Sequence, residues 1–322
     1  MAHTGLGALL LATCLGALPA ALHAQTYPAR PIKMIVPYPA GGITDILPRL
    51  MGEWLTGKWG QPIVVDNRPG AAGNIGAEAA FKAEPDGYTV MVSAPSPLTV
   101  NASLYPKLGF DPAAFVPVSI LATIPTGLIV NPRLPIGSVA ELIAFAKANP
   151  GKLTAATQGK GTTSHLTSEW FQIAAGVKFV HVPYRGSAPA LQGMVAGDID
   201  LMFDNLGISL ALATSGQLRL IAVATPKRLP SLPEVPTVTE TLSGFISSTW
   251  VGAFLPPNTP RPIADRLSAD FAQALRQPEI EQRFREHGCE PVGGTPEEAV
   301  AFVRNEIALW RRVIAEAGIT AE

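Results

Sequence analysis

A short apolar strand, a glycine-containing turn and a helix follow one another repeatedly along this chain. Residues 32–36 are apolar, residues 37–42 form a proline- and glycine-rich turn, and a helical segment then runs to about Leu55. The same order recurs after the apolar runs 62–66 and 154–157. Such alternation is typical of βαβ units on a largely parallel sheet, so the sequence predicts an α/β fold.

The alternation stops near residues 116–130 and then starts again, which indicates two α/β units. The apolar run 116–130 is broken by Pro125-Thr126-Gly127, and the chain becomes helical after Phe254. If the last helices return to the first unit, the chain crosses twice, near 123–130 and near 247–252. We therefore expect lobe one to comprise 27–126 plus 251–322, and lobe two 127–250. Two crossing strands permit closure about a hinge.

Length and charge exclude several classes of protein. The 322 residues correspond to about two domains. The 24 Lys and Arg residues nearly balance the 25 Asp and Glu residues, so the basic excess of a nucleic-acid binder is missing. A hydrophobic content of 47% with a net charge of -1 also excludes intrinsic disorder.

The first 24 residues contain no Lys, Arg, Asp or Glu and are mostly apolar. This pattern predicts a secretory signal peptide, residues 1–24, cleaved after Ala24. An uncleaved membrane anchor and a lipid attached at Cys14 are alternatives, although Thr13 stands where a lipoprotein site has a small residue. After cleavage only Cys289 is left, so no internal disulfide is expected.

Four turns share one design, with each placed between a predicted strand and a predicted helix. They span residues 39–45, 70–74, 159–165 and 185–189. A helix N-terminus exposes unpaired N–H groups and about half a positive charge, and glycine lets a ligand approach the backbone. These turns belong to the carboxyl ends of the strands, where α/β sheets bind ligands. Two turns from each lobe would form a cleft suited to a carboxylate.

No arrangement typical of catalysis is found. His165, His181 and His287 have no metal-ligand spacing, and none of the glycine turns matches a nucleotide-binding motif. We therefore expect no metal, no cofactor and no enzymatic activity. Asp45 and Asp204 each have two open interpretations, a ligand contact or a structural role at the end of a helix or strand.

These turns carry a resemblance to a known family, the Bug-type extracytoplasmic solute receptors, which are the substrate-binding component of tripartite tricarboxylate transporters. The resemblance follows the mature chain in order. The matching stretches are YPARPI (27–32), PAGGITD (39–45), NRPGAAGNIG (67–76), PDGYT (85–89), GTTSHL (161–166), VPYRGSAPA (182–190), MFDN (202–205) and PEVPT (233–237).

The resemblance implies a two-lobe periplasmic binding protein of type II, or Venus-flytrap, with a double crossover hinge. It implies a periplasmic monomer that captures a small organic carboxylate and delivers it to the membrane subunits of a transporter. A sensor that works with a membrane kinase, or less readily an α/β enzyme acting on carboxylates, are the alternatives. The residues implied to bind the ligand are Ala40, Gly41, Gly42, Thr44, Asp45, Ala71, Gly73, Thr162, Ser164, His165, Ser187, Ala188 and Asp204.

Overall fold

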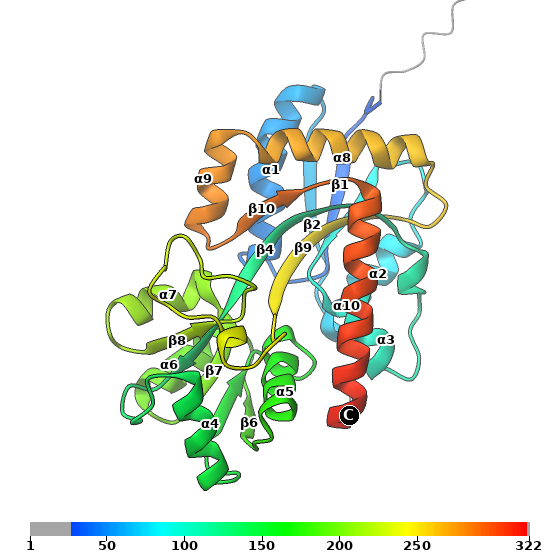
Figure 1. Cartoon of the computed structure of the whole chain (residues 1–322). Coiled ribbons are helices and arrows are strands. Elements are labelled where there is room, and N and C mark those ends of the chain that lie inside the picture. The colour runs from blue at the N-terminus through cyan, green and yellow to red at the C-terminus, as the bar shows by residue number, and fades with distance from the viewer. Residues whose placement is uncertain (1–26, 321–322) are drawn as a thin grey trace, which may run out of the picture.

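A computed structural model describes residues 27–320 and shows two α/β halves that share one sheet (Figure 1). The strand order is β2-β1-β3-β9-β4-β7-β5-β6, and β8 and β10 also pair with β4. The strands are β1 (Ile32–Val36), β2 (Ile63–Asn67), β3 (Thr89–Ser93), β4 (Val116–Val130), β5 (Thr154–Thr157), β6 (Val180–Pro183), β7 (Leu201–Asn205), β8 (Arg219–Val223), β9 (Ser248–Leu255) and β10 (Glu290–Gly293).

Helices alternate with the strands in both halves. The helices are α1 (Ile43–Trp59), α2 (Asn74–Phe81), α3 (Asn101–Leu104), α4 (Val139–Ala148), α5 (Thr163–Ala175), α6 (Ser187–Ala196), α7 (Leu206–Thr214), α8 (Arg261–Leu275), α9 (Pro278–Glu286) and α10 (Pro296–Ala317), with short helical turns η1 (Ala71–Gly73), η2 (Ser96–Val100), η3 (Pro112–Ala114) and η4 (Val238–Glu240). Strand β1 pairs in parallel with β2 and β3, and β5 pairs in parallel with β6 and β7. The α/β class with parallel units is therefore confirmed.

Strand β4 connects the two halves without interruption. Its first part, through Pro125, pairs with β9, and its last part, from Thr126 to Val130, pairs with β7. The expected break at residues 125–127 is wrong. Gly127 makes no turn there: a Cβ at this position would lie 2.7 Å from a Leu206 methyl carbon and 2.8 Å from a Leu220 one, so glycine permits close packing of the strand.

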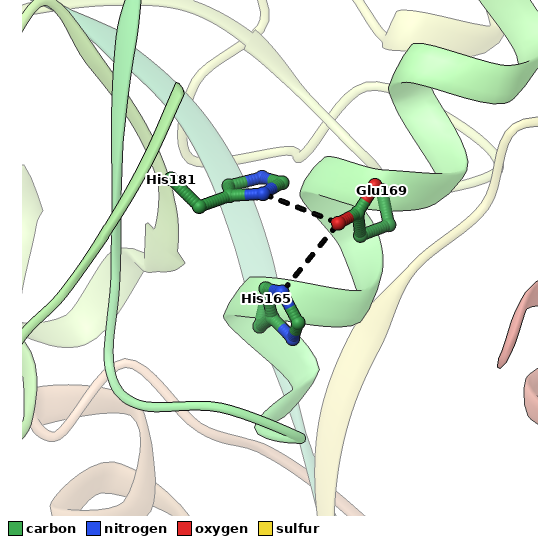
Figure 2. Close-up of side chains that lie close together, drawn as sticks. All are labelled: His165, Glu169 and His181. Carbon is green, nitrogen blue, oxygen red and sulfur yellow. Dashed lines mark ion pairs between the residues drawn. The ribbon is translucent and has the colours of Figure 1, made fainter. Parts of the chain in front are cut away.

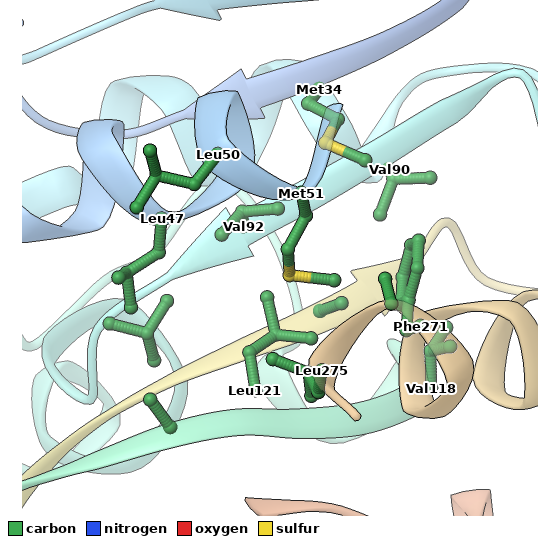
Figure 3. Close-up of a cluster of buried hydrophobic side chains, with 14 of the residues drawn as sticks. Met34, Leu47, Leu50, Met51, Val90, Val92, Val118, Leu121, Phe271 and Leu275 are labelled. Atoms are coloured by element: carbon green, nitrogen blue, oxygen red, sulfur yellow. The ribbon is translucent and has the colours of Figure 1, made fainter. Parts of the chain in front are cut away.

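Each half has its own hydrophobic core. In the first half, Met34, Met51 and Phe271 are fully buried in one cluster (Figure 3). Phe171 and Phe203 are buried in the core of the second half. Full burial of such a side chain contributes about 1.5–3 kcal/mol. Because α8 supplies Phe271, the chain does return to the first half near its end. The exact lobe boundaries stay a prediction, which the change of strand partner along β4 supports.

The last helix, α10, contacts both halves. It packs against β4 and also against α5. Trp310 of α10 is buried in a cluster with Leu166 of α5 and Leu104 of α3. Thr295 and Glu298 have the Thr-x-x-Glu spacing that predicts a capping box, and the box is present at the start of α10. This helix therefore braces the two halves on one flank, as Figure 1 shows.

Helix α1 begins slightly earlier than its sequence indicates. Thr44 and Asp45 are residue types that cap helices, which predicts a start there and an end near Leu55. The helix instead runs from Ile43 to Trp59 with Gly42 as its N-cap. The Asp45 carboxylate reaches back from the first turn and accepts the N–H of Gly41.

Ser138 and Glu141 have the Ser-x-x-Glu spacing that predicts a helix cap. This cap is confirmed, because the Ser138 side chain accepts the Glu141 N–H at the start of α4.

Over residues 27–320, no helix is both long enough and apolar enough to cross a bilayer. The predicted signal peptide and Cys14 lie outside the described residues.

Candidate ligand-binding site

A cavity of about 310 Å³ lies between the two halves. It is lined by Gly41, Gly42, Ile43, Ile46, Ile124, Gln158, Ser187, Asn205, Gly207, Glu286 and His287. Its volume is at the lower end of the ~300–1,000 Å³ found for small-molecule sites. A larger cavity of about 510 Å³ between α7 and residues 232–235 has none of these helix starts in its lining, so the smaller cavity is the candidate site.

Three helix N-termini line this cavity. Gly42 caps α1, Ser187 is the first residue of α6, and Asn205 caps α7. None of these three helices has a hydrogen bond from a capping side chain, whereas Ser138 caps α4 and Thr162 caps α5. The first N–H groups of a helix have no partner within the helix and carry partial positive charge. The cavity is therefore suited to an anion.

The side chains that line the cavity are mostly neutral. Among residues 27–320, its lining includes no Lys or Arg. Glu286 is the one acidic residue of that lining; it is exposed and its Oε1 accepts a hydrogen bond from Gln282. Ile43, Ile46 and Ile124 form an apolar part. A ligand with an anionic end and an apolar body fits this distribution.

Asp45 holds the first-half turn in shape rather than lining the cavity. Its Oδ2 accepts the Gly41 N–H at 2.9 Å, and its Oδ1 accepts Arg49 at 2.7 Å and Asn67 at 2.9 Å. The hydrogen bond from Arg49 is the main cause that lowers the pKa of Asp45 to about 2, with burial opposing it. The buried carboxylate is ionised and satisfied, and it positions Gly41 and Gly42 at the cavity.

Asp204 lies behind the second-half turn in a different state. Its Oδ1 accepts hydrogen bonds from the Ser187 hydroxyl and from Gln158 Nε2, at 2.6 Å for the latter. Its Oδ2 is buried, and no atom of residues 27–320 forms a hydrogen bond with it. Burial raises the pKa of this carboxyl, and the bonds from Ser187 and Gln158 offset part of the rise. Protonation of Asp204 would weaken the hydrogen bond that the Ser187 hydroxyl donates to it.

Of the four turns that the sequence indicated, two reach the cavity, one from each half. From the turn 39–45, Gly41 and Gly42 line the cavity, and from the turn 185–189, Ser187 does. Ala40 and Ala188 are exposed neighbours of these residues, and Thr44 is buried within α1.

The turn 70–74 does not line the cavity. Ala71 is exposed with a φ of 47°, and Gly73 is buried beside Pro37 and Pro97. Asn101 donates to the Ala72 carbonyl, which ties this turn to the start of α3.

The turn 159–165 is also outside the lining, because its side chains bond to their own half. Thr162 caps α5 through its Oγ1, and the Ser164 hydroxyl donates to the Phe203 carbonyl at 2.5 Å. His165 Nδ1 accepts the Gly161 N–H at 3.2 Å. The predicted ligand roles of these residues stay predictions.

Sequence reasoning missed several lining residues. Gln158 directly follows the predicted strand 154–157, and Asn205 is the last residue of β7, so the rule that ligands bind at the carboxyl ends of strands could have found both. Glu286 and His287 had no such signal, because only the packing of α9 brings them to the cavity. Gly207 packs closely against the backbone at His287, and a Cβ at position 207 would lie 2.3 Å from the His287 carbonyl oxygen.

The fold and the interlobe cavity define a two-lobe α/β binding protein, and solved structures that match the chain include periplasmic binding proteins. Residues 47–319 match the model of the tripartite tricarboxylate transporter family receptor. The chain therefore belongs to this family of solute-binding receptors, which are not enzymes.

Three similar proteins illustrate the relationship. Protein BugT of Bordetella pertussis is 37% identical over 302 residues, which cover 93% of each chain. The R. palustris protein Rpa4515 with adipate is 38% identical with a TM-score of 0.82, over 91% of this chain and 99% of that one. MatC (Rpa3494) from Rhodopseudomonas palustris with bound malate is 30% identical with a TM-score of 0.78, over 89% of this chain and 100% of that one.

Proposed function

We propose that this receptor captures a small organic carboxylate in the cavity between its halves. The observation that carries the proposal is the convergence of three uncapped helix N-termini on one cavity. Hydrogen bonds to a charged group contribute about 1.5–3 kcal/mol each, so a few backbone and side-chain donors can hold a carboxylate without a Lys or Arg. The adipate and malate bound by two similar proteins support this ligand class.

Asp204 is proposed to act in its protonated form. An ionised Asp204 behind Ser187 would repel an anionic ligand. It would also accept the hydrogen bond from the Ser187 hydroxyl, which would then not donate to the ligand. The neutral form removes the repulsion and lets Ser187 donate to the ligand. The buried position of Asp204 and its unpartnered Oδ2 support this role.

Isothermal titration calorimetry tests the ligand class. The ligands are adipate, malate, citrate, a monocarboxylate of similar length, and adipamide as the uncharged control. We expect at least one acid to bind with a Kd of about 1 μM, which corresponds to roughly -8 kcal/mol, and adipamide to bind far more weakly. The absence of heat for every acid, or equal binding of adipamide, would contradict the proposal.

We further propose that the receptor works in the periplasm and delivers its ligand to the membrane subunits of a tripartite tricarboxylate-type transporter. The family match and the apolar first 24 residues support this placement. Cell fractionation should find the mature protein in the periplasmic fraction. Uptake of the labelled acid into proteoliposomes that contain the membrane subunits should require the receptor, and uptake without it would contradict delivery.

A further inference from the structure

Two histidines and a glutamate converge in the second half, outside the lining of the candidate cavity. His165 and Glu169 lie one turn apart on α5, and His181 lies on the neighbouring strand β6 (Figure 2). Glu169 Oε1 is 3.6 Å from His165 Nε2 and 3.2 Å from His181 Nδ1. A metal ion could be held by three or more His, Cys, Asp or Glu side chains at one place among residues 27–320, and this cluster is that place. Its three ligand atoms all lie within 4.8 Å of one another.

We propose that His165 Nε2, Glu169 Oε1 and His181 Nδ1 form a binding site for a divalent transition-metal ion such as Zn²⁺. Ligand atoms about 2.0–2.1 Å from a tetrahedral zinc ion lie roughly 3.3–3.4 Å from one another. The two distances from Glu169 Oε1 to the imidazole nitrogens bracket that value. One of them, at 3.6 Å, is too long for a hydrogen bond.

The residues around the three ligands support this interpretation. Ser168 Oγ lies 2.9 Å from His181 Nε2 and can accept its proton, which leaves the Nδ1 lone pair for the metal. Gln172 Nε2 donates to Glu169 Oε2 at 2.7 Å, so the other oxygen, Oε1, is directed toward the imidazoles. Such partners orient ligands and are typical of metal sites in proteins.

The cluster is accessible from solvent. The side chains of Glu169 and His181 are 21% and 16% exposed, so an ion can enter from solvent and a water molecule can complete a four-coordinate shell.

The ligand types determine the selectivity of the site. Two of the three ligands are imidazoles, so the site should select Zn²⁺, Cu²⁺ and Ni²⁺, which prefer imidazole, over Mg²⁺ and Ca²⁺. Nδ1 of His165 accepts the Gly161 N–H, so a metal at Nε2 binds at the cost of this hydrogen bond.

Metal binding to the untagged, EDTA-stripped protein tests the proposal. Equilibrium dialysis against Zn²⁺ should leave one bound ion per chain, and excess Mg²⁺ should not displace it. Bound Co²⁺ should show the visible absorption of four-coordinate geometry. His181→Ala and Glu169→Gln should each weaken binding at least about tenfold. Glu279→Gln removes an exposed carboxylate outside the cluster and should leave Zn²⁺ binding unchanged.

Less than one bound ion per chain, or binding that survives both substitutions, would overturn the assignment. If the substituted proteins do not fold, imidazole ¹⁵N resonances of the unaltered protein decide. Zn²⁺ should shift His165 and His181 but not His287, and shifts at His287 alone would also overturn it. Carboxylate titrations are separate from these readouts, so this proposal can fail while the proposed function holds.

Discussion

Asp45 and Asp204 support the two turns that face each other across the cavity, and they do so in opposite states. Asp45 is a saturated carboxylate, because Arg49, Asn67 and the Gly41 N–H all bond to it. Within the part of the chain that the structure describes, buried Asp204 pairs with no cation, and one of its oxygens has no partner. The pKa of Asp45 is low because of Arg49, and the pKa of Asp204 is high because of burial.

The comparison teaches how one residue type can serve an anion site in two ways. A carboxylate whose charge is neutralised by Arg49 can remain ionised near the ligand, whereas a carboxyl without a cation favours the proton. The first-half turn is thereby held in one shape. In the second half, Ser187 and Gln158 donate to Asp204, and the proposed protonation of Asp204 would weaken both hydrogen bonds.

Ser187→Ala should have the largest effect on ligand binding. The substitution removes a hydroxyl that lines the cavity, and a hydrogen bond to a charged group contributes about 1.5–3 kcal/mol. We expect the Kd for the preferred acid to rise roughly tenfold to a hundredfold, as measured by calorimetry. Ser215→Ala, at the exposed end of α7, is the control and should leave the Kd unchanged. An unchanged Kd in the Ser187 variant would place the ligand elsewhere.

Asp45→Asn should lower stability at neutral pH. The folded pKa of about 2 is below the ordinary aspartate value of 3.8, so this group stabilises the fold above about pH 4 and loses that contribution as the pH falls toward 2. The expected loss is about 1–2 kcal/mol after allowance for solvent screening, measured by urea denaturation.

The matched control is Asp265→Asn, whose carboxylate pairs with Arg261 on the surface. Its cost should stay below about 1 kcal/mol. The difference between Asp45→Asn and the natural protein should shrink below about pH 3. A difference that does not depend on pH would show that the ion pair is not its cause.

Gly207→Ala should push the two halves apart. The added Cβ would lie 2.3 Å from the His287 carbonyl oxygen, so one of the two backbones must move. The expected cost is about 1 kcal/mol, at the low end for overpacked sites because Gly207 is exposed, with a several-fold loss of affinity.

Gly57→Ala is the matched control for Gly207→Ala, because this helical glycine in α1 has open space at its Cβ position. It should raise stability by about 0.5–1 kcal/mol and leave affinity unchanged. Equal stability and equal ligand affinity of the two variants would show that the contact between Gly207 and His287 does not determine how closely the two halves approach each other.

Asp204→Asn should have the smallest effect of these substitutions on stability at low pH. At high pH it should raise stability, whereas Asp45→Asn lowers it. Because the folded pKa is raised, the natural protein loses stability as the pH rises through that pKa, and asparagine removes this loss. Thermal unfolding should show the variant gaining stability relative to the natural protein as the pH rises above about 4. Affinity for the acid should fall with pH in the natural protein alone, and parallel pH profiles would refute a protonated Asp204.

Local patterns predicted much of the fold and part of the site. The capping signals at Ser138 and Thr295 were correct, because a cap depends on residues three positions apart. The prediction failed at Gly127, where the glycine accommodates Leu206 and Leu220 from other elements and makes no turn. Likewise His165 and His181, which show no metal spacing along the chain, become neighbours only because α5 packs beside β6.

The sequence by itself determined the α/β class, the order of the units, and which glycines precede helices, because periodicity and turn chemistry act over a few residues. Tertiary structure alone decided which helix starts face one another, that the end of α9 reaches the cavity, and that Asp45 meets Arg49 and Asn67 while Asp204 meets no cation. The physical reason is that charge, burial and closeness across the cavity depend on how whole elements pack, and no local pattern encodes that packing.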